Sequence, residues 1–108
     1  MNIQTNFSLK KFNTFGIEAY AREFISVSSV ANLKEVVQLK KDLFILGGGS
    51  NMLLTQNIEK LVVHINLKGR EIVEENDDFA IVKAQAGENW HEFVLWCIDQ
   101  NFGGIENL

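Results

Sequence analysis

The spacing of apolar residues predicts three strands in the first part of the chain. Residues 23–27 alternate between polar and apolar side chains, which is typical of a strand with one buried face. Residues 44–46 and 61–65 are short, nearly continuous apolar runs, as expected for strands buried on both faces. Residues 1–20 are mixed and rich in turn formers, with Asn13-Thr14-Phe15-Gly16 in the middle.

A helix is predicted between the first two of these strands. Ser28 or Ser29 can cap its first turn, and the pattern continues to about Lys41. Four apolar residues share one face at helical spacing: Val30, Leu33, Val36 and Val37. Strand, helix and strand together predict a β-α-β unit.

A hairpin and a second helix are predicted near the end of the chain. Residues 71–74 and 80–84 have strand composition, and Asn76-Asp77-Asp78 supplies turn residues between them. Asn89 can cap a helix, with Glu92 placed to reach back as in a capping box. An amphipathic stripe follows at helical spacing: Trp90, Phe93, Val94, Cys97 and Ile98. The fold class indicated is α/β or α+β, with one or two helices covering a mixed sheet.

The strongest candidate for chemistry is the segment that follows the second strand. It comprises Leu46, Gly47, Gly48, Gly49, Ser50, Asn51 and Met52. Consecutive glycines can turn several backbone N–H groups toward one point, which makes a concavity that suits a phosphate. The segment matches neither the dinucleotide fingerprint nor the phosphate-loop motif. A tight turn without a ligand is an alternative of comparable weight.

Composition limits the kinds of partner. The net charge of −4 argues against a nucleic-acid or membrane-surface protein, because both require a basic face. A single cysteine excludes an internal disulfide and fits a reducing compartment, so a cytoplasmic protein is expected. The chain contains no proline, and it ends in a turn-rich apolar sequence. We therefore expect the chain to be part of a longer protein.

The other residues with chemical potential favour structural roles. His64 lies in an apolar strand and is expected to be a satisfied core or edge histidine, while His91 is expected to be solvated. Cys97 and Trp90 fall on the apolar stripe, where a packed thiol and a core ring are expected. The spacing of His, Cys, Asp and Glu predicts no metal site. No catalytic residue is predicted in the chain.

Five stretches, taken in order, resemble the N-terminal part of the UDP-N-acetylenolpyruvoylglucosamine reductases. These flavoenzymes complete UDP-N-acetylmuramate in bacterial cell-wall synthesis. The stretches are Asn13-Thr14-Phe15-Gly16-Ile17, Ile45-Leu46-Gly47-Gly48-Gly49-Ser50-Asn51-Met52-Leu53, Ile65-Asn66-Leu67-Lys68-Gly69, Ala86-Gly87-Glu88-Asn89-Trp90-His91 and Gly104-Ile105-Glu106-Asn107-Leu108. Each is unspecific alone, but their order and spacing make the match a strong one.

The resemblance implies an FAD-binding domain of the vanillyl-alcohol-oxidase (PCMH) type, built from two α+β subdomains. Residues 1–66 would form the first subdomain, and residues 67–108 would begin the second with a mixed sheet and a covering helix. The loop Gly47–Asn51 would hold the FAD pyrophosphate, flanked by Leu46 and Met52. NADPH and a nucleotide-sugar substrate are implied for the longer enzyme.

The resemblance also implies what this chain lacks. The family's catalytic arginine, serine and glutamate, and its substrate domain, have no counterpart here. We therefore expect the chain alone to be inactive and to self-associate, because a subdomain without its partner exposes apolar surface. Two alternatives stay open: a stand-alone nucleotide-binding, flavin-binding or interaction module without catalysis, and another flavin oxidoreductase of the same fold. A small-molecule domain unrelated to flavin is a weaker third.

Overall fold

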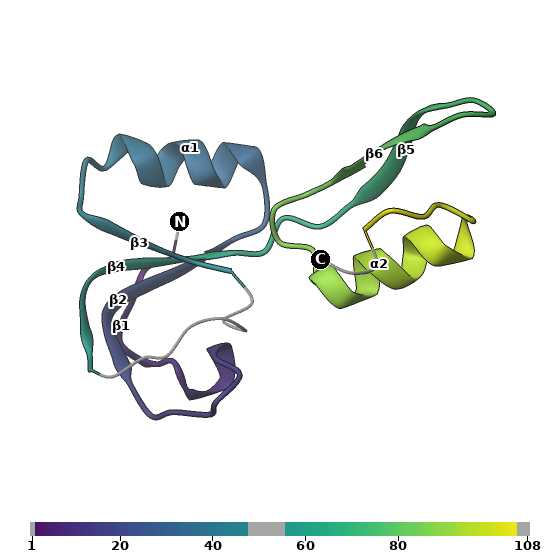
Figure 1. The fold of residues 1–108 in the computed structure, drawn as a ribbon. Helices are drawn as coiled ribbons and strands as arrows, with labels where there is room; N and C mark the ends of the chain where they lie inside the picture. The colour runs from purple at the N-terminus through teal and green to yellow at the C-terminus, as the bar shows by residue number, and fades with distance from the viewer. Residues whose placement is uncertain (1, 48–55, 106–108) are drawn as a thin grey trace. The chain divides into compact units, whose positions relative to one another are not determined.

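The computed structural model describes residues 2–47 and 56–105. The chain divides into two compact units, Met1–Leu67 and Lys68–Leu108 (Figure 1). Regular elements of the first unit are β1 (Gln4–Ser8), the 3-10 helix η1 (Lys10–Phe12), β2 (Tyr20–Val27), α1 (Val30–Gln38), β3 (Leu43–Leu46) and β4 (Ile58–Ile65). Those of the second are β5 (Arg70–Glu75), β6 (Ala80–Ala84) and α2 (Trp90–Asp99).

A four-stranded mixed sheet forms the centre of the first unit. Its strand order is β1-β2-β4-β3. β1 pairs antiparallel with β2, while β2 and β3 both pair parallel with β4. The predicted β-α-β unit is present as β2, α1 and β3, and β4 lies between its two strands. The sheet has one register shift, between Ala21 and Glu23 of β2.

The two faces of this sheet are covered differently, as Figure 1 shows. α1 lies across one face, which we call the α1 face, and the segment containing η1 lies over the other, which we call the η1 face. Buried residues on the α1 face are Ile25, Val27, Val36, Leu61, Val63 and Ile65. Those on the η1 face are Leu9, Ala19, Ala21, Phe24, Leu46 and Val62. Alternation along β2 and β4 fills both cores, because successive side chains point to opposite faces.

α1 begins as predicted and ends earlier than predicted. The Ser29 side chain accepts a hydrogen bond from the N–H of Asn32 at 3.1 Å, which caps the first turn. The helix ends at Gln38 rather than near Lys41, because Lys40 adopts a left-handed conformation with φ of 55°. Of the four apolar residues predicted to share one face of this helix, only Val36 is buried.

The turn-rich first 20 residues also contain a strand that the sequence pattern did not identify. β1 forms there, and the first three of its five residues are exposed, so no apolar alternation marked it. Behind it, Asn13 is 8% exposed and ties the following loop together. Its Nδ2 donates to the carbonyls of Leu9 at 2.8 Å and Ile17 at 3.1 Å, and its Oδ1 accepts from the N–H of Ile17 at 3.0 Å. One buried amide thus closes the loop between Leu9 and Ile17.

The second unit contains the predicted hairpin and helix. β5 and β6 pair antiparallel, and the Asn76 Oδ1 accepts hydrogen bonds from the N–H groups of Asp78 and Phe79 in the turn. Asn89 caps α2 by accepting from the N–H of Glu92 at 2.9 Å, as predicted. The described part of the second unit contains a two-stranded antiparallel sheet. The mixed sheet lies in the first unit and not, as expected from the resemblance, at the start of the second.

The predicted apolar stripe of α2 is only partly buried. Phe93 and Cys97 are buried, whereas Trp90 and Ile98 are each 49% exposed. The expectation that Trp90 is a core residue was wrong. The middle of the stripe is therefore buried, while residues at its two ends are about half exposed.

Candidate functional site

The parallel pairing of β2, β4 and β3 places the carboxyl ends of three strands at one edge of the sheet. Ligands of open α/β sheets favour such an edge. Leu46 ends β3 with its side chain fully buried, and Gly47 follows it as an exposed residue. The other predicted site residues, Gly48, Gly49, Ser50, Asn51 and Met52, lie outside the described residues. The structure thus positions the start of the glycine run at the expected edge.

Gly47 leaves space beside the main chain. A β-carbon built at Gly47 would meet no atom of residues 2–47 and 56–105 within 4 Å, and its φ lies outside the left-handed region. The fold therefore does not itself require glycine at this position. Open space next to a bare backbone is what the close approach of a phosphate needs, so this described end of the segment fits a diphosphate.

A serine and a histidine lie on the strands next to this edge. The Ser26 Oγ and the His64 Nδ1 are 2.9 Å apart on neighbouring strands β2 and β4. His64 also contacts the rings of Phe12 and Phe24 on the η1 face. The expectation of a histidine satisfied at the margin of the core is confirmed by this hydrogen bond and by its intermediate burial.

Sequence reasoning missed the pairing of Ser26 with His64. The two residues are separated by 38 positions, and only the strand order brings them together. The sequence did show that Ser26 and His64 are polar residues within apolar strands. A polar side chain there needs a hydrogen-bond partner, but the sequence does not say which residue provides it.

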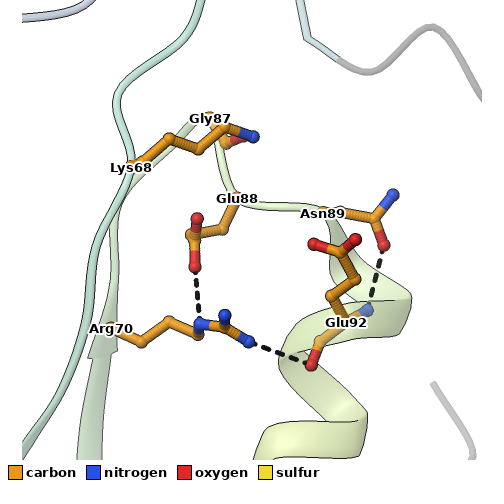
Figure 2. A network of polar contacts seen from close by, with 6 residues as sticks. All are labelled: Lys68, Arg70, Gly87, Glu88, Asn89 and Glu92. Carbon is orange, nitrogen blue, oxygen red and sulfur yellow. Dashed lines mark hydrogen bonds and ion pairs between the residues drawn. The ribbon is translucent and has the colours of Figure 1, made fainter.

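A polar network joins the first residues of the second unit to the start of α2 (Figure 2). The Arg70 Nε lies 2.8 Å from the Glu88 Oε1, and its Nη1 donates to the carbonyl of Glu92 at 3.2 Å. Lys68 donates to the carbonyl of Gly87. The Glu88 side chain is 13% exposed and the Arg70 side chain 33%, so the pair is partly shielded from solvent. These contacts order the turn between β6 and α2, a role that the sequence did not reveal.

A hollow lies at the opposite edge of the first unit's sheet, at the amino ends of β2 and β4. Its charged side chains pair with one another: Arg22 lies 3.6 Å from Glu59, with both side chains about three-quarters exposed. Glu23 is bound by Lys41 at 2.9 Å. Exposed pairs of this kind add little to stability or to a site. The glycine edge is therefore the better candidate.

The Cys97 thiol has the properties of a packed side chain rather than a nucleophile. It is 2% exposed on the inner side of α2. Burial raises the pKa of the Cys97 thiol, and the positive charge of Arg70 only partly opposes that effect. A reactive cysteine requires the reverse, a lowered pKa and access to solvent. The expectation of a packed thiol is confirmed.

The raised pKa of Cys97 predicts a loss of stability in alkaline solution. The folded state holds the thiol proton more tightly than the unfolded state does. The contribution of the protonated thiol to folding stability is therefore complete below the unfolded pKa of about 8.5, and it is lost as pH rises through the higher folded pKa. We expect the urea midpoint to fall as the pH rises above about 8.5. A Cys97→Ala variant should lose this part of the pH dependence, whereas an unchanged profile would contradict the assignment.

Among residues 2–47 and 56–105, no group of three or more His, Cys, Asp or Glu side chains could hold a metal ion. In that same part of the chain, no helix is long and apolar enough to cross a membrane.

Comparison with known proteins agrees with a site for a flavin nucleotide. A family described as FAD binding domain matches residues 21–108. The UDP-N-acetylenolpyruvoylglucosamine reductase of Flavobacterium johnsoniae is 63% identical over 110 residues, covering 100% of this chain and 33% of that protein. The reductases of Pseudomonas aeruginosa and Neisseria gonorrhoeae are 39% and 41% identical, covering 100% and 93% of this chain and 33% and 30% of theirs.

These relatives are matched over only part of their length. The chain spans about a third of the length of the curated relatives it matches. Its resemblance to the N-terminal part of these reductases is confirmed, as is an α+β fold of the FAD-binding type. The family match covers most of the chain, and it includes both the glycine edge and the second unit. This chain belongs to the FAD-binding domain family.

Proposed function

We propose that this chain is the N-terminal FAD-binding portion of a UDP-N-acetylenolpyruvoylglucosamine reductase. The observation that carries the proposal is the position of the glycine run. It begins at the carboxyl ends of the parallel strands β2, β4 and β3, and no described residue would contact a β-carbon at Gly47. Support also comes from the 63% identity to the Flavobacterium johnsoniae reductase, which extends over the whole chain.

The proposed task of the glycine segment is to hold the diphosphate of FAD. Backbone N–H groups of Gly47, Gly48 and Gly49 would donate to phosphate oxygens, and the Ser50 hydroxyl and Asn51 carboxamide would add donors at the rim. Leu46 and Met52 would flank the segment, with the buried Leu46 side chain anchoring its first residue to the sheet. Bound FAD would supply hydride transfer, while these residues bind and orient it.

The reduction itself is assigned to the longer protein. There NADPH would provide the hydride, and the enolpyruvyl ether of a UDP-sugar would receive it, so that UDP-N-acetylmuramate forms for peptidoglycan. The catalytic side chains would lie beyond Leu108, and this chain alone would be inactive. A cytoplasmic location and self-association of the isolated chain also remain proposals.

Titration of the chain with FAD tests the proposed function. We expect binding with a Kd above about 1 μM, because part of the cofactor's surroundings would come from the rest of the protein. Quenching of flavin fluorescence measures the affinity, and NADPH oxidation with the enolpyruvyl substrate measures turnover. We expect no turnover above a protein-free control.

Three other outcomes would separate the alternatives. The absence of any FAD binding would contradict the proposal. Tight binding by a stable monomer without turnover would instead favour a stand-alone flavin-binding module. Robust turnover by this chain alone would show that it carries the catalytic groups, contrary to the proposal.

A further inference from the structure

The hollow at the amino ends of β2 and β4 has a volume of about 720 Å³. Ligand pockets commonly have about 300 to 1,000 Å³, so a small molecule fits this one. Among the described residues that line it, Ile58 is the only aliphatic side chain, and the others are polar, phenolic or charged. The glycine run begins at the carboxyl ends of the parallel strands, so the hollow is separate from the proposed diphosphate site.

Two departures from regular strand geometry lie at the rim of this hollow. Asn6 has a left-handed φ of 51° within β1, a conformation that asparagine tolerates better than most residues but that regular strands do not use. Asn6 stands opposite Arg22, and the register of β2 on β4 shifts there, between Ala21 and Glu23. Bulges and left-handed residues redirect side chains and are frequent beside functional sites. Asn6 and Arg22 both line the hollow.

The charged side chains at the hollow balance one another. The Arg22 Nη1 lies 3.6 Å from the Glu59 Oε2. Glu23 accepts two hydrogen bonds from the Lys41 Nζ, at 3.0 and 2.9 Å. A simple anion or cation would be attracted by one member of each pair and repelled by the other. The lining therefore favours a neutral ligand.

The hydrogen-bonding groups of the hollow include both donors and acceptors. The Asn57 Oδ1 accepts from the N–H of Tyr20 at 3.0 Å, which orients the carboxamide and leaves its N–H groups to donate to a ligand. Arg22 adds donors, Glu59 adds acceptors, and the Thr5 hydroxyl can do both. A sugar hydroxyl also both donates and accepts, so a ring with several hydroxyls matches this mixed lining. Tyr20, which is 40% exposed, adds an aromatic surface for the C–H groups of such a ring.

We propose that this hollow binds a neutral sugar ring. Asn57, Arg22 and Glu59 would form hydrogen bonds with its hydroxyls. Tyr20 would pack against its C–H groups, and Asn6 would add a carboxamide at the rim. The proposal goes beyond the proposed function, since it needs neither FAD nor the glycine run.

NMR titration of the whole chain with glucose, galactose, mannose and xylose tests this inference. We expect at least one of these sugars to bind with a Kd of about 1 to 10 mM, because one small ring in an open hollow buries little area. The side-chain amide signals of Asn6 and Asn57 and the backbone amide signal of Tyr20 should shift. Unmoved signals at about 100 mM of every sugar would overturn the inference. Tighter binding of inorganic phosphate or adenine at the same residues would overturn it as well.

The Asn6→Gly variant tests the rim of the hollow. Glycine adopts a positive φ without strain, so the urea midpoint of the variant should stay close to that of the parent chain. The variant lacks the carboxamide, and we expect it to bind the sugar about three- to tenfold more weakly.

The Asn101→Gly variant is the matched control. Asn101 also has a left-handed φ, of 63°, but it belongs to the second unit and does not line the hollow. This variant should bind the sugar as the parent chain does. Equal sugar affinity of the Asn6→Gly variant and the parent, or equal weakening in the two variants, overturns the inference.

Discussion

Replacing Gly48 by valine is expected to weaken FAD binding by at least about tenfold, or about 1.4 kcal/mol. Valine would fill the space that the phosphates need, and its branched side chain opposes the positive φ that a main-chain nest uses. Flavin fluorescence titration of the parent and variant chains gives the ratio of the two dissociation constants.

The Gly47→Ala variant is the matched control for this experiment. A β-carbon at Gly47 would contact none of the described residues, and φ lies outside the left-handed region, so the variant should fold like the parent. A methyl group at the edge of the site should weaken FAD binding less than valine at Gly48 does. Equal FAD affinity of the Gly48→Val variant and the parent chain would rule out the assignment of this segment.

Replacing Asn13 by alanine is expected to lower the free energy of unfolding by about 2 to 3 kcal/mol. The variant loses three hydrogen bonds and leaves both backbone groups of Ile17 without their side-chain partner. Because Asn13 is almost fully buried, water cannot readily replace the lost amide. Urea unfolding followed by circular dichroism measures the change.

Asn66 provides the control for this second experiment. Its side chain is exposed, and its contact with the sheet is a backbone hydrogen bond from its N–H to the carbonyl of Val27 at 2.8 Å. Asn66→Ala should therefore change the unfolding free energy by less than about 0.5 kcal/mol. Similar losses in the two variants would indicate a general asparagine effect rather than a loop held by Asn13.

Features set by neighbouring residues were predictable from the sequence. The caps of both helices depend on contacts three residues apart, and Ser29 and Asn89 make those contacts. The hairpin turn depends on Asn76 and the residues just after it. The glycine run was placed at the end of a strand by the same local reasoning, and β3 ends there.

Features set by distant residues were not predictable. β1 carries no apolar alternation, and it is a strand because it pairs with β2, a segment more than ten residues away. The exposure of Trp90 depends on which residues pack against α2, and helical spacing alone does not reveal them. The neighbours of His64 depend on the strand order, so a local reading identified the residue as satisfied without identifying Ser26 as its partner.

The placement of β4 between β2 and β3 has a consequence for how the chain acquires its structure during synthesis. β2 and β3 leave the ribosome first, yet neither pairs with the other, and each pairs with the later strand β4. The parallel part of the sheet therefore cannot assemble until Ile58–Ile65 has emerged. Nascent chains that end before Ile58–Ile65 would contain the glycine run but not the strand β4 that completes the sheet edge beside it. If the glycine run binds FAD as proposed, binding would therefore follow the insertion of β4.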